Sequence, residues 1–102
     1  MINVCVLTGR VLTDPELNSC GGAPCTTFYM GITIGPYKAG GIKVCFPPKL
    51  ADLVDAILHQ GDRVTVIGVI GRYESEDNKL NDPLELVLLA DDFEVQRIAP
   101  VS

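Results

Sequence analysis

The chain has 102 residues, the size of one domain with a single hydrophobic core. It contains 8 Lys and Arg against 13 Asp and Glu, and the resulting net charge of −5 excludes the strongly basic kind of nucleic-acid binder. No apolar run reaches the roughly 18 residues of a membrane helix, and the start at Met1 lacks the features of a signal peptide. We therefore expect a cytoplasmic protein, one domain over residues 1–102, with no membrane partner.

The charge is unevenly distributed along the chain. Residues 1–50 hold four basic and two acidic side chains, whereas residues 51–102 hold four basic and eleven acidic ones. Counted with Gly and without Tyr, more than half of the residues are apolar, against a usual 45–50%. For so small a domain this predicts that part of the apolar surface is buried by a partner, most simply another copy of the chain.

Residues 2–8 alternate and are rich in β-branched side chains, which predicts a first strand. Its two faces carry Ile2, Val4 and Val6 on one side and Asn3, Cys5 and Leu7 on the other. Because both are largely apolar, we expect burial on both sides. Gly9 then marks a bulge or bend, and residues 13–16 have turn chemistry.

Residues 25–34 form the clearest strand of the sequence. The inward side is predicted to be Thr26, Phe28, Met30, Ile32 and Ile34, and the outward side Thr27, Tyr29, Gly31 and Thr33. Residues 35–41 are expected to be a loop. A third strand over 42–46 follows, with Lys43 and Cys45 pointing outward.

The apolar spacing over residues 48–60 predicts a helix that starts at Pro48 and ends before Gly61. Strands over 63–70 and 84–97 follow, joined by a polar hairpin tip at 73–82, with a kink at Asp91 and Asp92. The order of three strands, one helix and two strands predicts an all-β OB-fold, a five-stranded Greek-key barrel with its helix between strands three and four.

The sequence gives little support for a catalytic site or a metal site. His59 is the sole histidine and lies at the predicted helix end without a partner for acid–base or nucleophilic chemistry, so we expect no enzyme and no cofactor. Cys20 and Cys25 flank a short turn, but zinc sites usually need four ligands in two close pairs, so we expect no metal. A Cys20–Cys25 disulfide is geometrically conceivable, and four unpaired thiols is the interpretation that a reducing cytoplasm favours.

Single-stranded nucleic acid remains as a candidate ligand, because bases stack on aromatic rings while cations follow the phosphates. The candidate residues are Tyr29, Tyr37 and Tyr73 for stacking, and Arg10, Lys38, Lys43, Lys49 and Arg72 for phosphate contacts. RNA is an alternative ligand to DNA, because stacking does not separate the two. The competing interpretation is that Tyr29 and Tyr73 only cover sheet surface.

Several short motifs resemble the bacterial single-stranded-DNA-binding protein family. They are Met1-Ile2-Asn3, the stretch Leu7-Thr8-Gly9-Arg10-Val11-Leu12, Asp14-Pro15-Glu16-Leu17, Gly21-Gly22, Phe28, Lys49-Leu50-Ala51, and Gly61-Asp62-Arg63-Val64 with Val66 and Gly68. The resemblance spans residues 1 to about 97 and implies an OB-fold, no enzymatic activity, single-stranded DNA as ligand, a place in DNA replication and repair, and assembly as a homodimer or homotetramer. In the family strand one pairs across a subunit interface, which places Asn3, Cys5 and Leu7 in that interface.

The sequence departs from the family at the stacking positions. The family stacks bases mostly on tryptophan, and this chain has none; one stacking site falls near Tyr37, and others fall at Gly41, Pro47 and about Ser75. The sequence also shows no glycine-rich tail with an acidic tip, which in the family recruits repair and replication enzymes. We therefore expect weaker DNA binding than is typical and no recruitment of that kind. The alternative hypothesis is an OB-fold protein-interaction module that has lost DNA binding.

Overall fold

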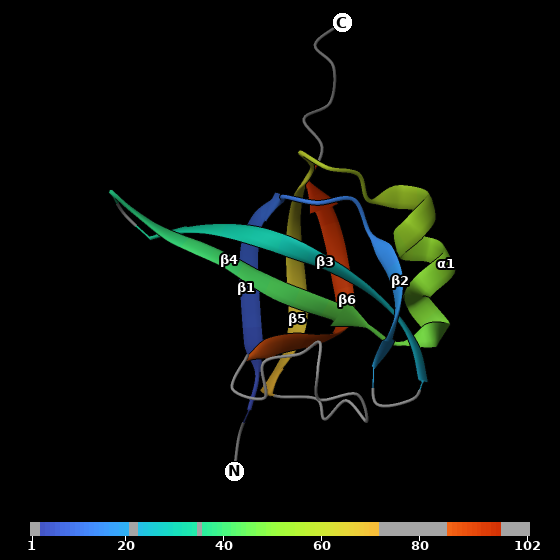
Figure 1. Ribbon diagram of the computed structural model, residues 1–102. Coiled ribbons are helices and arrows are strands. Elements are labelled where there is room, and N and C mark those ends of the chain that lie inside the picture. The colour runs from blue at the N-terminus through green and yellow to red at the C-terminus, as the bar shows by residue number, and fades with distance from the viewer. Residues whose placement is uncertain (1–2, 21–22, 35, 72–85, 97–102) are drawn as a thin grey trace, which may run out of the picture.

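The computed structural model describes residues 3–20, 23–34, 36–71 and 86–96, and the side chains of residues 19, 20, 23, 34 and 37–39 are not among the described groups. Six strands and one helix occupy these ranges (Figure 1). Their bounds are Cys5–Val11 for β1, Glu16–Cys20 for β2, Ala23–Ile34 for β3, Tyr37–Phe46 for β4, Pro48–Ile57 for α1, Arg63–Gly71 for β5 and Val87–Gln96 for β6. None of the described residues belongs to a helix with the length and apolarity that crossing a membrane requires.

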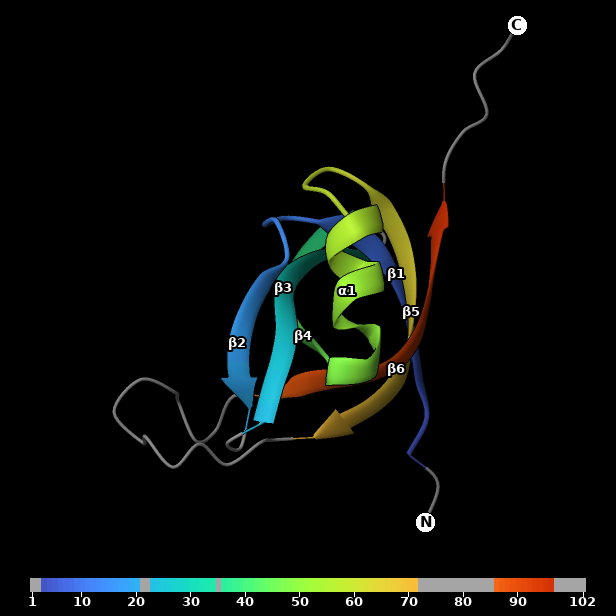
Figure 2. The same cartoon turned by 90° about the vertical axis from the view of Figure 1, so that its right-hand side faces the viewer.

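The strands close into a barrel in the order β1, β5, β6, β4 and β3, and β3 returns to β1 through the pairs Arg10–Gly31 and Val11–Met30. The β4–β6 pairing is parallel, and the other pairings are antiparallel. β1 and β2 pair one after the other with β3, so together they serve as one bent strand of a five-stranded barrel. α1 covers one end of this barrel (Figure 2). The predicted OB-fold is confirmed.

The strand β2 is an element that the sequence analysis did not predict. It pairs with β3 from Glu16–Thr27 to Cys20–Ala23, directly after the turn. The side-chain amide of Asn18 donates a hydrogen bond to the hydroxyl of Thr27. Thr27 is therefore buried, although alternation along β3 assigned it to the polar outer face.

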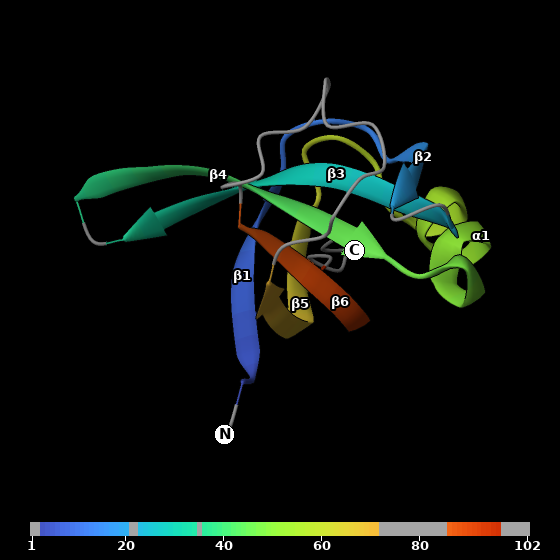
Figure 3. The ribbon, with the colours of Figure 1, turned by 60° about the horizontal axis from the view of Figure 1, so that its bottom comes forward.

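The β3–β4 hairpin is longer than predicted. Residues 37–41 were expected in a loop, but β4 begins at Tyr37 and pairs with β3 as far as the Ile34–Tyr37 pair. The loop prediction is wrong because cross-strand pairing overrides the low strand propensity of glycine. The hairpin projects from the barrel on the side away from α1 (Figure 3).

The hydrophobic core fills the interior of the barrel, and α1 closes it at one end. The predicted inward residues Phe28, Met30 and Phe46 are almost completely buried, and Val54 and Leu58 join them from the helix end of the barrel. The Phe28 and Phe46 rings stack with centroids 5.9 Å apart. Two predictions for the faces are wrong or incomplete, as Cys45 is buried instead of outward and Ile32 is only partly buried.

Two glycines are required by the close approach of neighbouring backbone. A Cβ atom at Gly9 would lie 2.2 Å from the carbonyl oxygen of Gly31, and one at Gly68 would lie 2.2 Å from that of Leu89. Gly9 is thus a point of tight strand packing inside β1 and does not interrupt the strand. At Gly68 the β5–β6 register shifts, which leaves Asp91 as the extra residue and confirms the kink predicted there.

The helix ends three residues earlier than predicted. α1 stops at Ile57, because Leu58 adopts an extended conformation and enters the core. Two carboxylates hold the turn that follows: Asp62 accepts a hydrogen bond from the backbone N–H of His59 (3.0 Å), and Asp14 accepts one from that of Gln60 (2.8 Å). The Asp62 bond stabilises the loop that leads into β5, and the Asp14 bond ties the β1–β2 connection to that loop.

The cysteines correct the expectation of four unpaired thiols. Cys25 is disulfide-bonded, whereas Cys5 and Cys45 are thiols. The fourth cysteine of the sequence, Cys20, ends β2, and its side chain lies outside the described part of the chain.

Candidate nucleic-acid interface

The outer face of the β3–β4 pair presents one aromatic ring beside one cation. Tyr29 on β3 lies directly opposite Lys43 on β4, and both belong to the outward row of their strands. Tyr29 is 41% exposed, and Lys43 is partly buried. A half-exposed ring next to a lysine is the combination that stacks a base and contacts its phosphate.

The connection between β1 and β2 fixes the strand that carries Tyr29. The backbone carbonyl of Tyr29 accepts a hydrogen bond from Leu12 N–H (2.7 Å), and its N–H donates to the hydroxyl of Thr13 (3.0 Å). The Leu12 side chain then lies over Gly31 and Gly41, because its methyl groups would touch a Cβ atom added at either glycine. Tyr29 and Leu12 therefore border one continuous outer surface.

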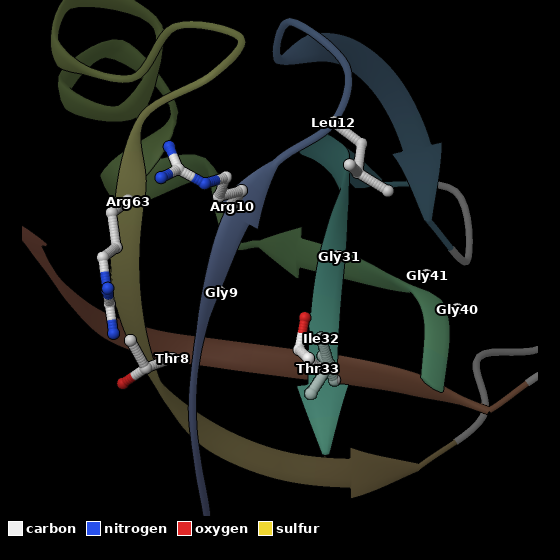
Figure 4. A pocket seen from close by; sticks show the side chains of 10 residues that line it. All are labelled: Thr8, Gly9, Arg10, Leu12, Gly31, Ile32, Thr33, Gly40, Gly41 and Arg63. Atoms are coloured by element: carbon white, nitrogen blue, oxygen red, sulfur yellow. The ribbon is translucent and has the colours of Figure 1, made fainter. Parts of the chain in front are cut away.

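A hollow of about 610 Å³ opens next to this surface (Figure 4). β1 pairs with β3 only at Arg10 and Val11, so the two strands diverge beyond that point and leave a fork. Its wall on the β1 and β5 side carries Thr8, Arg10 and Arg63, and the hairpin supplies the opposite wall. The hairpin residues that line it are Gly31, Ile32, Thr33, Gly40 and Gly41.

The two arginines of the hollow occupy opposite backbone positions on neighbouring strands. Arg10 on β1 is the direct partner of Arg63 on β5. A guanidinium nitrogen of Arg10 donates to the carbonyl of Gly61 (3.1 Å). Arg63 was not predicted as a site residue, because nothing local in the sequence indicates that it lies opposite Arg10.

Of the remaining predicted DNA-binding residues, only Lys49 has a described side chain. Lys49 is exposed on the first turn of α1, which follows the end of β4 remote from Gly40 and Gly41. The backbones of Tyr37 and Lys38 lie in the projecting hairpin, and their side chains are not described. Arg72 and Tyr73 lie outside the described residues.

The residues predicted for an oligomer interface make contacts within the single chain. Cys5 and Leu7 pack against the core, and the side-chain amide of Asn3 binds the backbone of Ile70. The outward side chains of this segment are Val4 and Val6, which are 70% and 57% exposed. Both faces of this segment are apolar, and within one chain the barrel core uses the face that carries Cys5 and Leu7. The place of Asn3, Cys5 and Leu7 in an oligomer interface remains a prediction.

No group of three or more His, Cys, Asp or Glu side chains among the described residues is arranged to hold a metal ion. His59 is exposed, and its ring nitrogen Nδ1 lies 3.1 Å from the carbonyl of Ile57. The arrangement is therefore that of a binding surface with one aromatic ring, an apolar floor and cations around it.

Comparison with known proteins finds relatives only at the level of structure. No family model and no curated protein matches the sequence. The chain superposes on a small single-stranded DNA-binding protein from Streptomyces coelicolor with a TM-score of 0.73 and 18% identity, covering 94% of this chain and 95% of that one. It superposes on the second single-stranded DNA-binding protein from Mycobacterium smegmatis with a TM-score of 0.74 and 20% identity, covering 100% and 99%.

A third similar structure is the Plasmodium falciparum single-stranded DNA-binding protein in complex with single-stranded DNA. The TM-score is 0.68 at 18% identity, and the match covers 95% of this chain and 97% of that one. In all three comparisons nearly the whole of each chain takes part. The chain has the OB-fold found in these single-stranded DNA-binding proteins.

Proposed function

We propose that the chain is a non-enzymatic, cytoplasmic member of the single-stranded-DNA-binding family, a single OB-fold domain that binds single strands without sequence preference. The observation that carries the proposal is the surface that joins Tyr29 and Lys43 to the hollow with Arg10, on a fold shared over nearly the whole chain with three single-stranded DNA-binding proteins. No other described feature of the molecule offers a ring, an apolar floor and cations together.

The affinity is proposed to be modest. One stacked base contributes about 1–3 kcal/mol, and Tyr29 is the one exposed aromatic ring among the described side chains. The positions where the family resemblance places further stacking residues include Gly41, which has no side chain to stack. The net charge of −5 also repels phosphates at low salt. Tyr37, Tyr73, Lys38, Lys49 and Arg72 remain proposed contributors.

Assembly into a homodimer or homotetramer is proposed through the outer face of β1 and β5. Val4 just before β1, Val6 on β1 and Val69 on β5 are exposed there, and Val6 lies opposite Ile67. On the other edge of β1, residues 5–9 have no strand partner among the described residues. An apolar face next to an unpaired strand edge supports pairing with a second copy.

The test is fluorescence anisotropy of a labelled oligo-dT in the presence of increasing protein, at about 50 mM and then 200 mM salt. We expect saturable binding that weakens at the higher salt, and a similar affinity for a mixed-sequence strand of equal length. A duplex of the same sequence serves as the control and is expected to bind more weakly. Absence of binding to oligo-dT at 50 mM salt contradicts the proposal.

The alternative function is a protein-interaction module for a basic partner. It is favoured by Asp91, Asp92 and Glu94, whose exposed carboxylates line one side of β6. Affinity capture from lysate with and without nuclease distinguishes the two functions. Partners that disappear after nuclease treatment support DNA binding, and partners that persist support the interaction module.

A further inference from the structure

Arg10 and Arg63 are an unusual pair for the end of a strand ladder. They occupy directly opposite positions on the antiparallel strands β1 and β5. Directly opposed like charges destabilise a sheet. Among the described residues the Arg63 side chain makes no hydrogen bond or ion pair, and the Arg10 side chain makes only its hydrogen bond to the Gly61 carbonyl. Most of the N–H donors of the two guanidinium groups are therefore available to a ligand.

The carboxylates near this pair are engaged elsewhere or do not reach it. Asp62, next to Arg63 in sequence, accepts the backbone N–H of His59, and Asp14 accepts that of Gln60. The direct partner of Arg63 on β6 is the neutral Gln96, whose amide donates to Thr65. Among the described residues no ion pair neutralises either guanidinium group, although the exposed Glu94 lies two residues before Gln96 on β6.

Arg10 and Arg63 are both among the residues that line the hollow, and Figure 4 shows their side chains on its β1 and β5 side, with Arg10 extending toward the Gly61 turn and Arg63 toward Thr8. Glycines form much of its lining, so backbone is exposed there and a bulky ligand can approach it closely. The hydroxyl of Thr8 stands on the same wall. A guanidinium group binds a phosphate through two parallel N–H···O contacts, which a lysine ammonium group cannot provide.

The hollow is continuous with the surface that carries Tyr29. Leu12 lines the hollow and also covers Gly41, and a Cβ atom at Gly41 would lie 4.0 Å from the Tyr29 ring. A strand whose base stacks on Tyr29 can therefore cross Leu12 and bring a neighbouring phosphate into the fork. This path leads across β1 toward β5, away from α1.

We propose that Arg10 and Arg63, from opposite positions on β1 and β5, form a clamp on the phosphate backbone of the bound strand, next to the nucleotide that stacks on Tyr29. The proposal rests on the proposed single-strand binding and adds to it a residue, Arg63, and a direction for the strand. Because Arg63 is exposed and has no partner in the described chain, its replacement leaves the fold intact.

The experiment compares Arg63→Gln and Arg10→Gln with Ala56→Glu, which makes the same change in net charge at an exposed position of α1. Anisotropy titrations with labelled oligo-dT at several salt concentrations give the slope of log K against log salt. For each arginine variant we expect about five- to tenfold weaker binding at 50 mM salt and a slope less steep by about 0.7. For Ala56→Glu we expect an unchanged slope. Arginine variants that behave like Ala56→Glu overturn the clamp while single-strand binding stands.

A second measurement does not depend on DNA binding. Inorganic pyrophosphate is titrated into the isotope-labelled protein while the amide signals of Gly9, Gly31 and Gly41 are followed by NMR. We expect these signals to shift in the wild type and to stay in place in Arg63→Gln. If oligo-dT does not bind to the wild type, the proposed function fails. The pyrophosphate titration then shows by itself whether the two arginines bind an anion. Absence of shifts in the wild type overturns the clamp.

Discussion

The side-chain amide of Asn3 binds both the N–H and the carbonyl of Ile70, as the backbone of a paired strand residue would. Its Nδ2 donates to the Ile70 carbonyl (2.8 Å), and its Oδ1 accepts from the Ile70 N–H (3.2 Å). The β1–β5 register, in which Cys5 pairs with Gly68, places Asn3 next to Ile70. The amide thus extends the ladder beyond the first residue of β1.

Replacement of Asn3 tests this extension. Asn3→Ala removes both hydrogen bonds, and we expect a loss of about 0.5–1.5 kcal/mol in the free energy of unfolding. Asn3→Asp keeps the acceptor but sets a carboxylate against the Ile70 carbonyl, so it is expected to lose at least as much. Urea denaturation followed by circular dichroism measures both values. An Asn3→Ala protein as stable as the wild type contradicts the expectation.

Opposed arginines carry an energetic cost that can be measured in the absence of any ligand. Replacing Arg63 by Gln removes the repulsion with Arg10, so we expect the free energy of unfolding to rise by about 0.2–1 kcal/mol. The gain is expected at low salt and to shrink in 1 M NaCl, because salt screens exposed charges. Thermal denaturation at the two salt concentrations measures it. A lower stability of Arg63→Gln at low salt would show that the side chain has a structural role.

Two glycines of the same region are expected to respond differently to Ala. A Cβ atom at Gly9 meets the Gly31 carbonyl oxygen at 2.2 Å, so one strand must move, and we expect Gly9→Ala to destabilise by about 1–3 kcal/mol. A Cβ atom at Gly41 meets nothing nearer than a Leu12 methyl group at 3.4 Å. Gly41→Ala is therefore the control and is expected to change stability little. Equal effects of the two substitutions contradict the packing argument.

The stacking role of Tyr29 is tested by separating its ring from its hydroxyl. Tyr29→Ala removes the ring, and we expect the affinity for oligo-dT to fall by about 1–3 kcal/mol, or roughly 5- to 150-fold. Tyr29→Phe keeps the ring and is expected to bind within a factor of about two of the wild type. Anisotropy titrations at 50 mM salt measure both. If Tyr29→Ala binds like Tyr29→Phe, the ring only covers the sheet.

The parts of the fold that sequence analysis predicted are those where local pattern and tertiary environment agree. Alternation over residues 25–34 identified the buried Phe28 and Met30 and the exposed Tyr29. The helix was identified from its apolar stripe, but its end was misplaced because Leu58 leaves the helix to fill the core. The long extent of β4 depends on pairing with β3, which a glycine-containing stretch does not reveal by itself.

The candidate site was predicted only in part, for a similar reason. Tyr29 and Lys43 were predicted from the outward rows of their strands, and Arg10 from its place beside the bend expected at Gly9. In the structure these three residues lie around the same surface. Arg63 could not be found because its proximity to Arg10 comes from the β1–β5 register, which joins residues 53 positions apart in sequence. Local periodicity carries no information about that register.

Local periodicity also does not show which apolar face of β1 forms the proposed subunit interface. A pair of substitutions on β1 distinguishes the two faces. Val6 points outward, so Val6→Lys is expected to leave the barrel folded and to reduce the mass in light scattering to that of one chain. Leu7 packs against the core, so Leu7→Lys is expected to unfold the protein. Val6→Thr, which keeps the β-branched shape, is the control and is expected to keep more of the assembly. A Val6→Lys protein with the wild-type mass, above that of one chain, places the interface on another face.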